Sequence, residues 1–174
     1  MKVVITARDF VKPDVDGSHI LSEAGYEVIE YCDGNYGIDT DNETMAKLIA
    51  DADAAIIGLE PINENVLRHC PNLKLISRRG IGYDSLNLDD LKKYGVSAVR
   101  TTGVVESAVA EHVMAYIMYF ARHIERQNSS MHRGEWKRIM TYGAKGRTLG
   151  LIGFGGIGKE IAKRADGFGM RILY

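Results

Sequence analysis

Three glycines near the end of the chain have the spacing of a phosphate-binding turn. Gly153, Gly155 and Gly158 follow an apolar stretch over 148–152 and precede a helical pattern over 159–168. In such a turn the first glycine allows a tight bend, the second lets the backbone approach a pyrophosphate, and the third allows close packing of helix and strand. The amides at the helix N-terminus then face the phosphates. The spacing predicts a dinucleotide-binding turn; a glycine-rich strand-to-helix connection is the alternative.

Other residue types that perform chemistry are scattered. Cys32 and Cys70 lack the spacing of a zinc or redox pair, and the five histidines lack metal-ligand spacing. We therefore expect no metal site and no disulfide framework, which fits a reducing, cytoplasmic setting. Glu111 and His112 are adjacent on a predicted helix and point about 100° apart, so they do not form a catalytic pair. No catalytic residue is assigned within the chain.

The elements that must position the turn begin with an α/β pattern. Strand-like runs over 2–6, 26–31, 54–58, 74–77 and 96–99 alternate with helical patterns over 14–24, 40–49, 63–69 and 88–94. This alternation predicts a parallel sheet covered by helices. Thr40 and Glu43 have the spacing of a capping box, and Asn87 is the expected N-cap of the helix that follows it.

A different pattern starts at Ser107. From Ser107 to Ala121 the chain is apolar on nearly every side, which predicts a helix buried between domains or subunits. It falls short of the roughly 20 apolar residues that cross a membrane, and the start of the chain does not read as a signal peptide. The basic stretch over 122–147 is read as a solvated polar face rather than an anion site. With 22 Lys and Arg against 23 Asp and Glu, nucleic-acid binding is not expected either.

Four blocks in order carry a family resemblance. They cover residues 71–84, with the run Ser-Arg-Arg-Gly-Ile-Gly-Tyr-Asp, residues 103–112, residues 134–136, and residues 146–158, which hold the glycine turn. The sequence resembles the D-isomer-specific 2-hydroxyacid dehydrogenases, most closely their phosphoglycerate dehydrogenase branch. The resemblance implies a flavodoxin-like substrate domain over 1–103. It also implies a truncated Rossmann NAD-binding domain over 104–174, made of a crossover helix and a first βαβ unit.

The resemblance also implies roles for single residues. Gly80, Ile81 and Gly82 would offer backbone amides to the carboxylate of a 2-hydroxy or 2-keto acid, and Ile81 would also approach the cofactor. The residues that would meet the pyrophosphate are Gly155, Gly156 and Ile157. The cofactor implied is NAD, with NADP left open, because the acidic residue that selects between them is expected at or just after Tyr174.

This sequence departs from the family pattern at three positions. Arg79 replaces a small residue, and it is either a ligand for a second anionic group, such as a phosphate, or an ordinary surface arginine. Arg78 matches the family. Gly156 stands where many relatives have an arginine, and Val105 stands where many have an asparagine.

Activity and assembly follow from the resemblance as expectations. The family's catalytic Arg, Glu and His would lie beyond residue 174, so the 174 residues alone are expected to be inactive. A homodimer through the helix from Ser107 to Ala121 is expected. The alternative function is that of the C-terminal-binding-protein corepressors, which resemble these enzymes but use nucleotide binding to control assembly with partner proteins.

Overall fold

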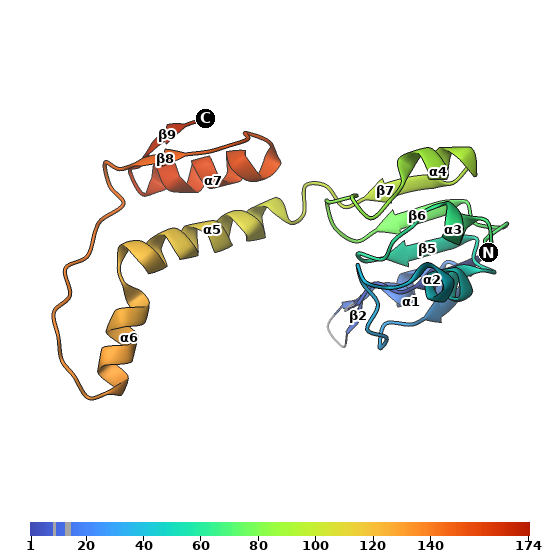
Figure 1. The fold of residues 1–174 in the computed structure, drawn as a ribbon, viewed down its shortest axis with the longest axis horizontal. Helices are drawn as coiled ribbons and strands as arrows, with labels where there is room; N and C mark the ends of the chain where they lie inside the picture. The colour runs from blue at the N-terminus through green and yellow to red at the C-terminus, as the bar shows by residue number, and fades with distance from the viewer. Residues whose placement is uncertain (9, 13–14) are drawn as a thin grey trace. The chain divides into compact units, whose positions relative to one another are not determined.

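A computed structural model describes residues 1–8, 10–12 and 15–174, with the backbone alone at 11, 12, 15 and 16 (Figure 1). The chain divides into two compact units, Met1–Thr102 and Gly103–Tyr174. Each unit has its own hydrophobic core.

The first unit is built on a five-stranded parallel sheet. Its strands are β1 (Lys2–Ile5), β4 (Glu27–Glu30), β5 (Ala54–Ile57), β6 (Leu75–Arg78) and β7 (Ser97–Arg100). They lie in the order β4-β1-β5-β6-β7, with Val4 opposite Ala55 and Ile57 opposite Arg78. Counted within this sheet, the second strand in chain order (β4) thus lies at one edge, and the first (β1) lies beside the third (β5), which is the flavodoxin-like order. The expected parallel sheet is confirmed, with strand ends shifted by one residue or so.

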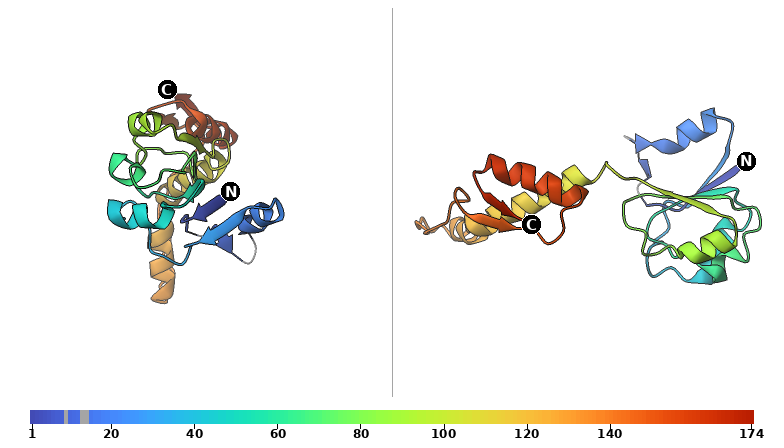
Figure 2. Two further views of the ribbon diagram at one scale, coloured as in Figure 1. Left: turned by 90° about the vertical axis from the view of Figure 1, so that its right-hand side faces the viewer. Right: turned by 90° about the horizontal axis from the view of Figure 1, so that it is seen from above.

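Helices cover both faces of this sheet. Helix α1 (Gly17–Glu23) lies on one face, whereas α2 (Asn42–Ile49), α3 (Glu64–Leu67) and α4 (Leu88–Lys93) lie on the other (Figure 2). Alternate residues along β1 separate accordingly, because successive strand side chains point to opposite faces. Val4 belongs to the core beneath α2 to α4, and Val3 and Ile5 belong to the core on the α1 side.

The N-cap of α2 differs from the sequence prediction. Asp41, not Thr40, caps the helix, because its Oδ1 accepts a 2.8 Å hydrogen bond from the Thr44 amide. The Thr40 hydroxyl instead accepts a bond from the Gly37 amide, and Glu43 pairs with Lys47. A carboxylate is the stronger acceptor for a helix N-terminus, which explains why the neighbouring aspartate takes the position. The prediction for Asn87 is confirmed, since its Oδ1 accepts from the Asp90 amide.

The helix expected over 14–24 is shorter than predicted. Residue 14 lies outside the described residues, and Val15–Asp16 forms strand β3, paired antiparallel with β2 (Val11–Lys12). Because Val15 and Asp16 pair with β2, the helix begins only at Gly17. Helix α3 is also short, with Asn63 as its N-cap rather than its first turn.

The second unit is a small β-α-β arrangement packed on a long helix. Its elements are α5 (Glu106–Ala121), α6 (Ile124–His132), β8 (Thr148–Gly150), α7 (Gly156–Gly167) and β9 (Arg171–Leu173). Strands β8 and β9 pair in parallel, and their shared core with α5 and α7 includes Ala110, Met114 and Ile161. Arg164 on α7 ties the two helices together by contacting Ser107 and Glu111 of α5.

Helix α5 buries only part of its apolar surface within this unit. Ala110 and Met114 are its buried residues, while Tyr116 and Phe120 are 53% and 69% exposed. In the part of the chain that the structure describes, no helix has both the length and the apolar character needed to span a bilayer.

Candidate functional site

The loops that follow β1, β5 and β6 meet where the strand order reverses. Ligands of doubly wound sheets bind outside the carboxyl ends of the strands at this switch point. A pocket of about 310 Å³ lies there, and we call it the arginine pocket. Its lining residues are Arg8, Tyr36, Gly37, Gly58, Leu59, Arg78 and Arg79. With three guanidinium groups in its lining, the pocket favours an anionic ligand.

Arg8 and Arg79 are both held by hydrogen bonds that cross between loops. The Arg79 Nη1 donates to the Arg8 carbonyl oxygen at 2.5 Å, which fixes this exposed side chain across the loop after β1. The Arg8 Nη1 donates to Asn35 Oδ1 at 2.9 Å. Both guanidinium groups retain further donors, because each carries five N–H groups.

Arg78 is buried at the end of β6. Its Nη1 donates to the carbonyl oxygen of Arg79, and its buried Nε has no partner among the described residues. A buried guanidinium with an unused donor is costly unless a ligand or water satisfies it. Gly80 makes room for this side chain: it has a φ of +132°, and a Cβ there would collide with Arg78 Nη1.

The turn from Gly80 to Gly82 continues directly from the arginine pocket. The Gly80 amide is already used, since it donates to Thr101 Oγ1 at 2.8 Å. The Ile81 carbonyl oxygen accepts a 3.0 Å hydrogen bond from Arg100 Nη1, which ties the turn to the end of β7. Within the described residues the amides of Ile81 and Gly82 have no hydrogen-bond partner. Two adjacent free amides suit a carboxylate.

The glycine turn of the second unit is tightly packed at Gly158 and open at Gly155. Gly153 has a φ of +96°, and a Cβ on Gly158 would lie 2.6 Å from the Gly153 carbonyl oxygen. A Cβ on Gly155 would meet no atom within 4 Å, so the backbone is open to a ligand there. The first amides of α7 lack helical acceptors, because the helix bonding begins with Lys159 N to Gly155 O. The residues present therefore fit a dinucleotide pyrophosphate.

An aromatic stack supports the same turn. The rings of Phe154 and Tyr174 are 3.9 Å apart and nearly parallel, at 9°. Phe154 lies between the first two glycines of the turn, and Tyr174 follows β9. The stack therefore joins the turn to the second strand of the β-α-β unit.

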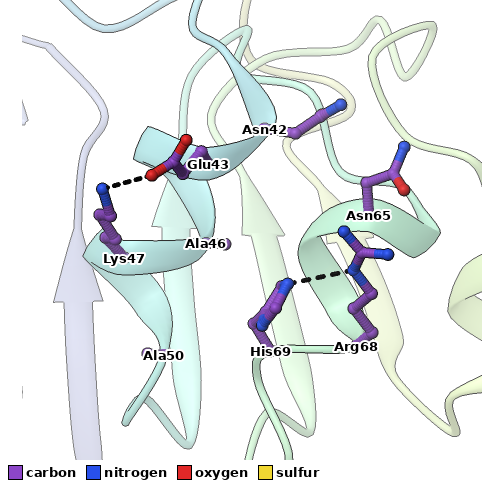
Figure 3. Close-up of a pocket in the computed structure, with 8 residues that line it drawn as sticks. All are labelled: Asn42, Glu43, Ala46, Lys47, Ala50, Asn65, Arg68 and His69. Atoms are coloured by element: carbon purple, nitrogen blue, oxygen red, sulfur yellow. Dashed lines mark hydrogen bonds and ion pairs between the residues drawn. The ribbon is translucent and has the colours of Figure 1, made fainter.

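A larger hollow of about 720 Å³ lies between α2 and α3 (Figure 3). Its charged groups mostly bond to one another: Lys47 pairs with Glu43, and Arg68 donates to His69 Nε2. It contains none of the site residues expected from the sequence. Among the described residues no group of His, Cys, Asp and Glu could hold a metal. Neither Cys32 nor Cys70 takes part in a disulfide among the described residues, and burial raises the pKa of the Cys70 thiol to about 11.

The structure thus brings Arg79 and the Gly80–Gly82 turn together, and it places the residues of the glycine turn at the start of α7. Sequence reasoning missed Arg8, Thr101 and Glu106. Glu106 accepts a hydrogen bond from the Gly103 amide and also lies against Gly156. The only sequence signal for Arg8 was its place just after the first strand, at the edge where ligands bind.

Comparison with known families agrees with this geometry. Residues 6–165 match the family described as D-isomer specific 2-hydroxyacid dehydrogenase, catalytic domain. The match covers most of the chain, so the chain belongs to this family of oxidoreductases. The resemblance inferred from the sequence blocks is confirmed.

Individual relatives support the same assignment. The chain is 35% identical to a glyoxylate reductase from Thermococcus litoralis, over 94% of this chain and 54% of that protein. The TT0316 protein from Thermus thermophilus matches with a TM-score of 0.86 at 28% identity, over 100% of this chain and 55% of that one. An NAD+-bound 3-phosphoglycerate dehydrogenase from Entamoeba histolytica matches with a TM-score of 0.78 at 28% identity, over 99% of this chain and 52% of that one. The chain spans about half the length of these proteins.

Proposed function

We propose that this chain supplies the substrate-binding unit and the pyrophosphate turn of an NAD-dependent enzyme that interconverts a D-2-hydroxy acid and its 2-keto acid. The observation that carries the proposal is the pair of free amides at Ile81 and Gly82 beside the arginine pocket, at the switch point of the sheet. Adjacent backbone donors without protein acceptors can bind a small carboxylate ligand.

The residues of this chain would bind and orient the substrate. The amides of Ile81 and Gly82 would hold its carboxylate, and Arg100 and Thr101 would keep the turn in shape through their bonds to Ile81 and Gly80. NAD, when bound, supplies or accepts the hydride at C2 of the substrate. The resemblance assigns proton transfer to residues beyond position 174, so we propose that residues 1–174 bind ligands without turnover.

The cofactor proposal concerns the second unit. We propose that residues 104–174 form the crossover helix and first β-α-β unit of a Rossmann domain, with the backbone at Gly153, Gly155, Gly156, Ile157 and Gly158 meeting the pyrophosphate. The open approach at Gly155 and the unpaired amides at the start of α7 support it. NAD is favoured over NADP by the resemblance, and the Entamoeba histolytica relative is described with NAD+.

Arg79 would extend substrate recognition to a second anionic group. It lines the arginine pocket directly beside the Gly80–Gly82 turn, and its bond to the Arg8 carbonyl oxygen uses one Nη1 donor only. A phosphate or second carboxylate on the substrate could then pair with the remaining donors.

Calorimetric titration of 2-keto acids tests these assignments. We expect glyoxylate, a monoanion, to bind wild type and Arg79→Ala alike, whereas a 2-keto acid with a second anionic group loses about tenfold or more in affinity. Arg68→Ala is the matched control, because Arg68 bonds to His69 outside the arginine pocket. If Arg79→Ala affected both ligands equally, the second-anion role would be wrong. If neither ligand bound wild type, the substrate site itself would be wrong.

We also propose a homodimer through α5. The aromatic residues Tyr116 and Phe120 are exposed on α5 with their ring centroids 6.3 Å apart, and Ile124 is exposed at the start of α6. Exposed large apolar side chains of this kind on a small unit are typical of a subunit interface.

A further inference from the structure

The first residues of α5 and α7 lie against each other. A Cβ on Gly156 would be 3.1 Å from Glu106 Cγ and 3.4 Å from Glu106 Oε1. The first of these distances is tighter than most side-chain contacts in proteins, so a Cβ at position 156 would require the Glu106 side chain to shift slightly. Gly156 therefore lets Glu106 pack closely beside the glycine turn.

The Glu106 carboxylate is held in this place from one side only. Its Oε1 accepts a 2.8 Å hydrogen bond from the Gly103 amide, while its Oε2 is buried and has no partner among the described residues. Arg164, which links α5 and α7, forms ion pairs with Glu111 and Glu160 and not with Glu106. Within the described residues the negative charge of Glu106 is therefore not balanced by an ion pair.

This charge stands at the N-terminus of α7, where the partial positive charge of the helix attracts anions. A pyrophosphate at the glycine turn would approach the same helix end. Two negative groups that share one helix N-terminus repel each other.

We propose that Glu106 is an affinity-determining residue of the pyrophosphate turn, whose carboxylate lies in contact with Gly156 and weakens dinucleotide binding. The inference rests on the proposed function, namely that this turn binds a dinucleotide. We assign two separable roles to Glu106. The charge opposes the pyrophosphate, and the hydrogen bond to the Gly103 amide holds the start of α5 in place.

Two substitutions separate the role of the charge from that of the hydrogen bond. Glu106→Gln removes the charge but keeps the size and an oxygen that can accept from the Gly103 amide, whereas Glu106→Ala removes both. Glu111→Gln is the matched control, because it removes the same charge from the same helix, and Arg164 keeps its bond to Glu160. Each protein is titrated with NADH at low and at high ionic strength, and thermal unfolding is recorded without ligand.

We expect Glu106→Gln to bind NADH about five- to tenfold more tightly than wild type at low salt. The gain should shrink at high salt because ions screen the repulsion. Glu111→Gln should bind like wild type. Without ligand, Glu106→Ala should unfold at a lower temperature than Glu106→Gln, because the Gly103 amide loses its acceptor.

The outcomes separate the inference from the function on which it rests. Equal or weaker NADH binding by Glu106→Gln, with wild-type binding intact and unfolding unchanged, would overturn the role of Glu106 alone. Absence of NADH binding in wild type and in all variants would overturn the proposed dinucleotide site and the inference with it.

Discussion

Gly158 packs so closely on Gly153 that an added Cβ would lie 2.6 Å from the Gly153 carbonyl oxygen. The obstacle is backbone, so it cannot move aside without changing the turn. We expect Gly158→Ala to destabilise the second unit by about 1–3 kcal/mol, the usual range for overpacking. Thermal and chemical unfolding measure the change.

Gly167→Ala is the control for that prediction. A Cβ at Gly167 meets no atom within 4 Å, and the residue lies in the last turn of the same helix. Alanine there should be neutral or stabilising, because glycine is the poorer helix former. If both substitutions had the same effect, the close approach of Gly158 to Gly153 would not be the cause.

Replacing the buried carboxylate of Glu60 should stabilise the protein. The side chain is 1% exposed, and both carboxylate oxygens are buried without a partner among the described residues. Removing an unpaired charge while keeping the volume should be favourable, so Glu60→Gln is expected to raise the unfolding temperature at neutral pH. Glu30→Gln, at an exposed position, serves as the comparison. A lower unfolding temperature for Glu60→Gln would show that the carboxylate has an essential function in the fold.

The stabilisation that Asp41 provides as the N-cap of α2 should depend on pH. Hydrogen bonds from the Thr44 amide and hydroxyl lower the pKa of the Asp41 carboxyl below its ordinary value of 3.8. Because the folded-state pKa is the lower one, the stabilisation is present above about pH 4 and is lost as the pH falls through the folded-state pKa. Asp41→Ala should therefore differ most from wild type near neutral pH and converge with it in strong acid. Circular dichroism measures the unfolding temperatures of both proteins across this pH range. A difference between them that stayed constant with pH would contradict the proposed role of the Asp41 carboxylate as the N-cap.

The dimer proposal predicts concentration-dependent sedimentation. Phe120 and Tyr116 expose large parts of their rings on α5, and charged replacements at both positions should prevent self-association. We expect wild type to shift toward a dimer as its concentration rises and the double variant to remain monomeric. A wild-type monomer at every concentration would contradict the proposed interface.

Local patterns in the sequence were enough to predict the sheet and the glycine turn. Strands alternate with helices at regular spacing, and Asn87 and the glycines over 153–158 act on residues close to them in the chain. Thr40 and Asp41 show the limit of this reasoning, because both are good N-cap residues and only the fold shows that Gly37 engages the threonine.

The site residues that the sequence did not reveal act across long separations. Arg79 bonds to Arg8, 71 positions away, and Gly80 bonds to Thr101, 21 positions away. Glu106 meets Gly156 from a different helix. Such contacts depend on how the elements pack, and no periodicity or motif encodes them.

The most direct test of the account is to observe the backbone amides while ligands are added. We would assign the amide resonances of the protein by NMR and titrate it separately with oxamate, an unreactive 2-keto acid analogue, and with NADH. The account predicts that oxamate shifts the amides of Ile81 and Gly82, and that NADH shifts those of Gly155, Gly156 and Ile157. Saturable shifts confined to other residues, or no shift at millimolar ligand, would contradict it.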